Sequence, residues 1–153
     1  MRLCSLYSGS SGNSIYVGND NTHLLVDVGV SGKKVEKGLN SIELSGNDID
    51  GLLITHEHSD HIAGLGVISR KYHIPIYATR RTIEAIKQYD KLGKIDEELY
   101  HEIMPDTTFS LKNIVIEAGS TWHDAADPVC YNFIGDNKKV SIATDLGDYD
   151  DYI

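Results

Sequence analysis

The segment THEHSDH, residues 55–61, holds three of the seven histidines of the chain together with one glutamate and one aspartate. His56 and His58 are two residues apart, so in an extended segment their side chains lie on the same side. Asp60 and His61 follow where a helix is expected to begin, and both can turn back toward the same point. Imidazole and carboxylate together suit zinc, iron or manganese. Because the ligands divide into a His-His pair and an Asp-His pair, the segment indicates two adjacent metal ions.

Two other interpretations of this segment compete with a two-metal site. A solvated polar loop that happens to be rich in histidine is one, but the clustering of so many ligand types argues against it. The helical zinc motif His-Glu-x-x-His is the other, and it is not matched, because the residue four positions after His56 is Asp60. Glu57 and Ser59 fall on the opposite side of the extended segment. Glu57 is therefore interpreted as a spacer that faces away from the ions.

The neighbouring elements are predicted to hold these ligands at the edge of a sheet. Residues 49–55 form a short apolar run typical of a buried strand, and residues 62–72 predict a helix that ends near His73. The other predicted elements are strands at 14–18 and 22–29, a helix at 30–44 capped by Ser31, a strand at 74–79, a helix at 80–93 closed by Gly93, and strands at 113–121 and 138–147. Both strand–turn–strand and strand–helix–strand units are present, so the fold class is α/β, a sandwich with a mixed sheet. The final residues, DYDDYI, are expected to start a helix.

Two ions need further ligands from distant parts of the sequence. His123 follows the strand at 113–121, and Asp145 lies at the end of the strand at 138–147. Both occupy the same kind of strand-to-loop junction as His56, and open α/β sheets place their sites at that edge. A carboxylate such as Asp145 can bridge two ions. Taken alone each signal is weak, since a lone histidine beside a tryptophan is usually structural and Asp-Leu-Gly can be a turn or a cap.

Residues 56–61 resemble the H-x-H-x-D-H signature of the metallo-β-lactamase superfamily, and His123 and Asp145 fall where its third and fourth metal motifs are expected. The run LLVDVG is similar to the family's strand that ends in Asp-x-Gly. Asp27 is therefore expected to support the ligands from behind, with a turn-forming aspartate as the alternative. The stretches YSGSSGNSIYV and TWHDAADPVCYNF resemble the branch that contains the bacterial WalJ/YycJ proteins, which are predicted nucleases or phosphoesterases.

This resemblance implies the αββα fold, two stacked mixed sheets flanked by helices, and two divalent metal ions (zinc, manganese or iron). It implies that one ion is held by His56, His58 and His123, that the other is held by Asp60 and His61, and that Asp145 bridges them. A later histidine normally completes the second ion, but no histidine follows His123. Residues 1–153 are therefore expected to form one metallo-β-lactamase-fold domain that is truncated at its C-terminus. Surface or structural roles are expected for the other three histidines, His23, His73 and His101.

The expected mechanism is hydrolysis. Between two ions bound water becomes hydroxide near neutral pH, and Asp60, as ligand and catalytic residue, would orient this nucleophile. The Gly/Ser-rich loop could present backbone N–H groups to a substrate phosphate; its candidate residues are Ser10, Ser11, Gly12 and Asn13. A simple flexible turn between strands is an equally good interpretation of that loop.

Three functions compete on this sequence. The favoured one is a phosphodiesterase or 5′–3′ exonuclease that acts on DNA or RNA. The second is a hydrolase of a small ester, lactone, thioester or β-lactam at the same ions. The third is a non-catalytic metal-binding or redox protein; the flavin-linked diiron members of the family usually carry glutamate where His58 stands, which favours hydrolysis.

The overall composition sets weaker limits. The net charge of −9 argues against a general nucleic-acid binder, although metal ions would offset charge locally and let a phosphate bind. There is no long apolar run and no apolar N-terminal segment, so neither a membrane partner nor secretion is expected, and a cytoplasmic location is the default. The two cysteines, Cys4 and Cys130, form no metal-binding pair and are expected to be buried thiols.

Overall fold

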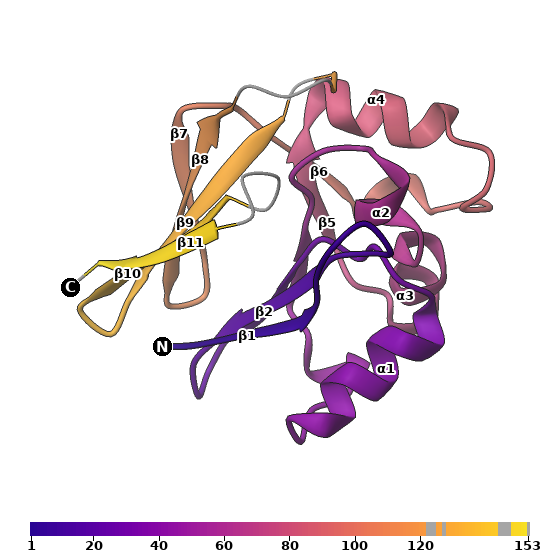
Figure 1. Ribbon diagram of the computed structural model, residues 1–153. Helices are drawn as coiled ribbons and strands as arrows, with labels where there is room; N and C mark the ends of the chain where they lie inside the picture. The colour runs from indigo at the N-terminus through magenta and orange to yellow at the C-terminus, as the bar shows by residue number, and fades with distance from the viewer. Residues whose placement is uncertain (122–124, 127, 144–147, 153) are drawn as a thin grey trace.

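The molecule consists of one layer of helices and two layers of β-sheet (Figure 1). The computed structural model describes residues 1–121, 125–126, 128–143 and 148–152. Its helices lie on the outer face of the first sheet; they are α1 (Gly32–Ser41), α2 (Ser59–Ile62), α3 (Leu65–Tyr72) and α4 (Arg80–Gln88), with short 3₁₀ turns η1 (Gly46–Asp48) and η2 (Glu97–Leu99). None of these described helices is long and apolar enough to cross a membrane. The described residues thus supply three of the four layers of an αββα sandwich.

The first sheet is mixed, as the sequence predicts. Its strands stand in chain order: β1 (Arg2–Tyr7), β2 (Ser14–Gly18), β3 (His23–Val26), β4 (Gly51–Leu53), β5 (Ile76–Thr79) and β6 (Tyr100–Ile103). Strands β1, β2 and β3 pair antiparallel, whereas β3 to β6 pair parallel and are connected through the helices. The carboxyl ends of β3 and β4 therefore meet at one edge of the sheet, and the segment 55–61 leaves the sheet there.

The second sheet is antiparallel throughout its described strands, whereas the family resemblance implies a mixed sheet. Its order is β11 (Asp148–Tyr152), β10 (Lys138–Ala143), β9 (Val129–Gly135), β8 (Ile114–Ser120) and β7 (Thr107–Leu111). In Figure 1 the described helices lie on the face of the first sheet that points away from the second sheet. The second sheet packs against the other face of the first sheet. Along β8, Ile114, Ile116 and Ala118 are buried and alternate with more exposed residues, which is the pattern of a half-covered strand.

Two hydrophobic cores hold the layers together, one between the helices and the first sheet and one between the two sheets. Strand β4 serves both cores. Leu52 and Ile54 belong to the core under the helices, and Leu53 between them belongs to the core between the sheets. Successive side chains of a strand point to opposite faces, so a continuous apolar run is what a strand buried on both sides needs. This run ends at the ligand segment and fixes its starting position.

Several predicted boundaries differ from the structure. The strand expected at 22–29 ends at Val26, because Asp27 has a positive φ of 63°. The helix expected at 80–93 ends at Gln88, and Gly93, with φ +71°, lies beyond it in the following turn. The prediction that DYDDYI starts a helix is wrong, since Asp148–Tyr152 form β11 and pair antiparallel with β10. Strands β1, β6 and β7 were not predicted.

Candidate metal centre

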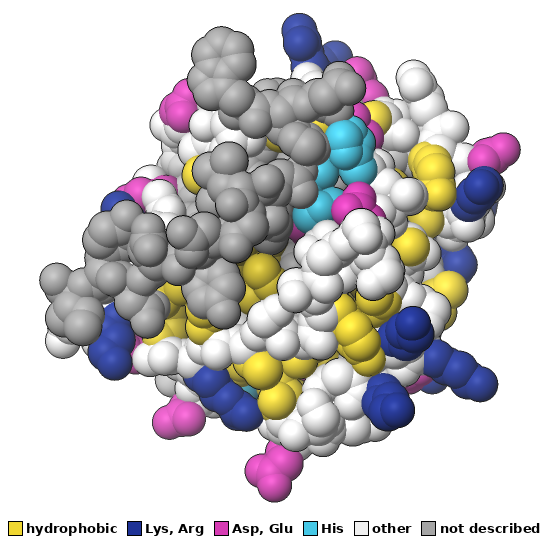
Figure 2. All heavy atoms as spheres, viewed as in Figure 1, with side chains coloured by type: hydrophobic (Ala, Val, Ile, Leu, Met, Phe, Trp, Pro, Cys, Tyr) yellow, Lys and Arg dark blue, Asp and Glu magenta, His cyan; other side chains and the backbone are white. Residues whose placement is uncertain are grey.

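The segment 55–61 brings three histidine rings together. The ring centroids of His56 and His58 are 4.7 Å apart, and those of His56 and His61 are 4.0 Å apart. His58 precedes α2, and the first turn of this short helix returns Asp60 and His61 toward the same place, with Asp60 Oδ2 3.7 Å from His61 Nε2. His56 and His61 are almost fully buried, at 2% and 0% exposure. In Figure 2, histidine and acidic side chains reach the surface together in the region where α2 lies in Figure 1.

Asp27 and Thr55 set the orientation of two of these rings. The buried carboxylate of Asp27 accepts hydrogen bonds from the Thr55 backbone N–H (2.8 Å) and hydroxyl (2.7 Å), and its Oδ2 lies 2.6 Å from His61 Nδ1. A carboxylate can only accept, so His61 Nδ1 carries the proton. The Thr55 hydroxyl gives its single proton to Asp27, so at 2.9 Å it can only accept from His56 Nδ1. In the neutral form of each ring, Nε2 is then the nitrogen without a proton, as in metal-binding histidines.

The backbone around Asp27 is shaped to reach the ligand segment. Its amide donates to the Leu53 carbonyl (2.8 Å), and the next residue, Val28, donates to the carbonyl of His61 (2.8 Å). Gly29 has no room for a side chain, because a Cβ there would overlap the Asp60 carbonyl oxygen. Asp27 thus combines the two features considered for it, a left-handed turn conformation and a carboxylate held against a candidate ligand.

The Gly/Ser-rich loop packs against the same segment. Asn13 is buried. Its side-chain amide accepts from the Gly9 N–H and donates to the Gly9 carbonyl at the other end of the loop, and it also donates to the carbonyl of Asp60 (3.3 Å), while its Nδ2 lies 3.3 Å from His61 Nε2. Its backbone N–H donates to the same Asp60 carbonyl at 2.8 Å. Gly12, at φ +138°, lies too close to the Gly29 carbonyl for a side chain. Of the four candidate phosphate residues, Asn13 holds the ligand segment in place and Gly12 packs against Gly29, whereas Ser10 and Ser11 are exposed.

Glu57 is not a spacer, which corrects the sequence-based interpretation. Its side chain is partly buried, and Oε2 accepts a hydrogen bond from the backbone N–H of Ala126 at 2.9 Å. Ala126 belongs to the connection between β8 and β9, 69 residues further along the chain. The period of an extended segment correctly separates Glu57 from its two histidine neighbours, but local spacing contains no information about a partner so distant in sequence.

The remaining two candidate ligands, His123 and Asp145, lie outside the described residues. The structure does describe the base of the connection in which His123 stands. The backbone N–H of Thr121 donates to Pro128 (3.1 Å), and that of Val129 donates to the carbonyl of Thr55 (3.0 Å). The start of β9 is thereby hydrogen-bonded to the residue that precedes His56.

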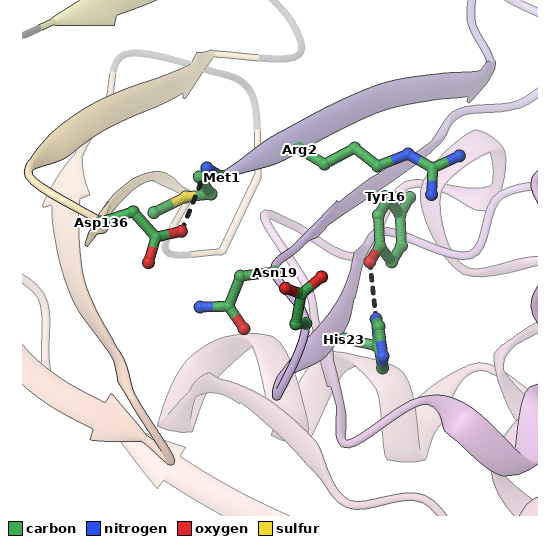
Figure 3. Close-up of a pocket in the computed structure, with 7 residues that line it drawn as sticks. Met1, Arg2, Tyr16, Asn19, His23 and Asp136 are labelled. Carbon is green, nitrogen blue, oxygen red and sulfur yellow. Dashed lines mark hydrogen bonds and ion pairs between the residues drawn. The ribbon is translucent and has the colours of Figure 1, made fainter.

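The other three histidines lie elsewhere. His101 is exposed and stacks on Tyr77, with centroids 5.0 Å apart. The Nδ1 of His23 is 2.6 Å from the Tyr16 hydroxyl, beside a polar pocket of about 400 Å³ at the end of β2 and the start of β3 (Figure 3). This pocket lies at the opposite ends of the strands from the segment 55–61. The expectation of structural or surface roles agrees with these positions.

His73 belongs to a second cluster of ligand-type side chains. The ligand atoms of His73, Asp96 and Glu98 all lie within 4.8 Å of one another, on the exposed surface beyond the end of α3. All three side chains are exposed, and the contact between His73 Nε2 and Glu98 Oε1 is 3.5 Å long. Proximity of this kind is common among surface charges that bind no ion. The buried segment 55–61 therefore remains the candidate metal centre.

The donors of this segment suit divalent transition metals. Three imidazole rings and the Asp60 carboxylate lie close together, and two of the imidazoles have their Nδ1 atoms engaged by a carboxylate and a hydroxyl. A fully buried carboxylate such as Asp27 is costly unless it is hydrogen-bonded, and here it serves Thr55 and His61 at once. This arrangement fixes the orientation of the His56 and His61 rings.

The family model of the metallo-beta-lactamase superfamily matches residues 7–147. The chain belongs to this superfamily. Among solved structures, a HARLDQ-motif mutant of the metallo-beta-lactamase from Cronobacter sakazakii superposes with a TM-score of 0.75 at 17% identity, over 91% of this chain and 59% of that one. This likeness shows the superfamily's fold.

Two curated relatives are more similar in sequence. The exodeoxyribonuclease YycJ of Bacillus anthracis is 44% identical over 144 residues, and the exodeoxyribonuclease WalJ of Streptococcus pneumoniae is 44% identical over 142 residues. Each comparison covers 93% of this chain and 53% of the relative. The chain thus spans about half the length of these relatives, and the superfamily's ligand segment falls within the shared half.

Proposed function

We propose that the protein is a metal-dependent hydrolase that cleaves phosphodiester bonds, as an exonuclease acting on DNA or RNA, in the cytoplasm. The observation that carries this proposal is the set of oriented histidines at 55–61, in which Asp27 contacts Nδ1 of His61 and Thr55 contacts Nδ1 of His56, so that the Nε2 atom of each ring is left for an ion. The choice of nucleic acid as substrate is supported by the two relatives named exodeoxyribonucleases. The absence of disulfides at Cys4 and Cys130 agrees with a reducing compartment.

Two divalent ions (zinc, manganese or iron) would be divided between the ligands as the family pattern implies. His56, His58 and His123 would hold one ion, Asp60 and His61 would hold the other, and Asp145 would bridge them. When bound, such ions lower the pKa of water and neutralise charge on the attacked phosphate. A further ligand, beyond those named, would complete the second ion.

The residues of this chain have distinct proposed tasks. Asp27 keeps His61 in the tautomer that can bind an ion, and Thr55 does the same for His56. Asp60 is partly exposed, at 34%, so its carboxylate can accept a hydrogen bond from the attacking water and orient it toward the phosphorus. Ser10 and Ser11 are exposed in the loop whose last residue, Asn13, is hydrogen-bonded to Asp60. This loop can offer backbone N–H groups to a phosphate oxygen.

The test is a substrate panel with the full-length protein and with residues 1–153. Each is incubated with Mn²⁺ and a 5′-phosphorylated single-stranded DNA, its RNA counterpart, a lactone and a thioester, and the His56→Ala variant serves as the control. We expect the full-length protein to shorten the nucleic acid only with metal present and the variant to be inactive. Cleavage of the small esters alone would establish the second candidate, and bound metal without any cleavage would establish a non-catalytic role.

A further inference from the structure

Glu57 lies between two candidate metal ligands, yet its hydrogen bond leads to another part of the chain. Its Oε2 accepts the backbone N–H of Ala126 at 2.9 Å, across 69 residues of sequence. Its second oxygen, Oε1, is buried and makes no hydrogen bond within the part of the chain that the structure describes. Burying a carboxylate oxygen without a hydrogen bond is unfavourable. Among the described residues, Ala126 is the hydrogen-bond partner of the Glu57 side chain, which suggests that this bond has a specific role.

That bond joins two segments that each contain candidate ligands. Glu57 is flanked by His56 and His58, and Ala126 stands three residues after His123 in the connection between β8 and β9. The base of the same connection is already fixed, because Val129 N–H donates to the Thr55 carbonyl at 3.0 Å. The bond from Ala126 to Glu57 thus adds a second point at which the connection is attached to the segment 55–61.

The chemistry of the contact suits positioning. A carboxylate that accepts a backbone N–H forms a charge-assisted hydrogen bond, which is shorter and stronger than a neutral one. It acts on the backbone of residue 126, so the identity of the alanine side chain is not important. Ligands from two segments must be brought to one point before they bind an ion, and this ordering costs conformational entropy. A bond that orders the connection beforehand lowers that cost.

We propose that Glu57 is a positioning residue that holds the β8–β9 connection at Ala126 against the segment 55–61 and thereby supports the candidate metal centre of that segment. The proposal rests on the metal centre of the proposed function, and it assigns to the residue between the two histidines a task other than binding the ion. It predicts that Glu57 affects metal affinity through the connection rather than through direct coordination.

The test compares Glu57→Ala and Glu57→Gln in the full-length protein, with Glu102→Ala as a control on an exposed glutamate of β6. Glutamine keeps a side-chain carbonyl that can accept from Ala126, whereas alanine keeps no acceptor. Mn²⁺ affinity is measured by titration calorimetry, and hydrogen exchange of the Ala126 amide is measured in EDTA, where no metal is bound.

We expect Glu57→Ala to weaken Mn²⁺ binding by about 10-fold or more, as loss of an outer supporting contact does. In EDTA it should speed exchange at Ala126 by about 10-fold or more. Glu57→Gln should restore most of both, and Glu102→Ala should change neither.

Unchanged exchange at Ala126 in Glu57→Ala would overturn the proposal, and so would a Glu57→Gln variant as impaired as Glu57→Ala. If the unsubstituted protein binds no Mn²⁺, the proposed function fails. In that case the exchange measurement still decides whether Glu57 holds the connection.

Discussion

Among the described residues, histidine and carboxylate side chains come together at the segment 55–61 and at a surface cluster, and the two clusters differ in how their rings are held. At the surface, His73, Asp96 and Glu98 place their ligand atoms within 4.8 Å of one another, but all three side chains are exposed. In the segment 55–61 the rings of His56 and His61 are buried, and Asp27 holds His61 through a 2.6 Å contact. The comparison shows that proximity alone does not distinguish the two clusters. What differs is whether a second residue fixes each ring and its tautomer.

The largest effect is expected from removing a buried ligand. His56→Ala should weaken zinc or Mn²⁺ binding by more than the ~10–100-fold typical of outer contacts and should abolish metal-dependent cleavage. His73→Ala removes the imidazole of the surface cluster and should change affinity less than about twofold, as surface changes usually do. Titration calorimetry and metal content of the purified variants measure both. A strong loss in His73→Ala would reverse the assignment of the two clusters.

The next effect concerns orientation rather than coordination. Asn tolerates the left-handed φ of 63° at position 27, so Asp27→Asn preserves the turn. Its amide no longer favours the proton on His61 Nδ1, and metal affinity should fall by about 10–100-fold. The matched change in the surface cluster is Glu98→Gln, since Glu98 contacts His73 Nε2 at 3.5 Å. Equal affinities for Asp27→Asn and the unsubstituted protein would show that the carboxylate has no orienting role.

A smaller effect is expected on stability. Tyr131, on β9, is fully buried, and its hydroxyl donates to the Ile54 carbonyl at 2.8 Å, just before the ligand segment. Burial raises the pKa of Tyr131 well above its usual value, so the hydroxyl remains a donor over the accessible pH range. Tyr131→Phe leaves that carbonyl without this bond and should lower the free energy of unfolding by about 1–3 kcal/mol. Urea denaturation measures it, with Tyr100→Phe, near the surface cluster, as the control.

The smallest effect is expected at the surface cluster itself. The side chains of His73 and Glu98 are 67% and 70% exposed, so solvent strongly screens the attraction between them. Glu98→Ala should change the free energy of unfolding by less than about 1 kcal/mol, and added salt should reduce even that difference. A larger loss in urea denaturation would show that this cluster is part of the stable framework, and the contrast with the buried cluster would then narrow.

The ligand segment could be predicted because its information is local. The spacing of the histidines and the helix start near Asp60 predict that four ligand-type side chains lie close together. The structure shows this closeness in the distances among the three rings and Asp60. Strand β2 was predicted at its observed bounds, and Ser31 caps α1 through its side chain as expected. These features depend on alternation and capping, which act over a few residues.

Contacts between distant segments could not be predicted in the same way. Asn13 appeared only as a candidate phosphate residue, yet its side chain contacts Asp60, 47 residues away. Glu57 appeared as a spacer, because its partner Ala126 is even further along the chain. The helix expected at 62–72 starts instead at Leu65, after a break at Gly64, where a Cβ would overlap the Val30 carbonyl oxygen. Such close approaches arise from packing and are absent from local periodicity.

Strand β4 contributes side chains to a different hydrophobic core on each of its faces, so the position of each residue along this strand is strictly fixed. Leu53 faces the second sheet, and Leu52 and Ile54 face the helices, immediately before the ligand segment. An insertion or deletion of one codon in this strand would exchange the two faces. It would also displace the hydrogen bond from Thr55 to Asp27. Insertional scanning should therefore find β4 intolerant to changes of length by a single residue, even where every inserted residue is hydrophobic.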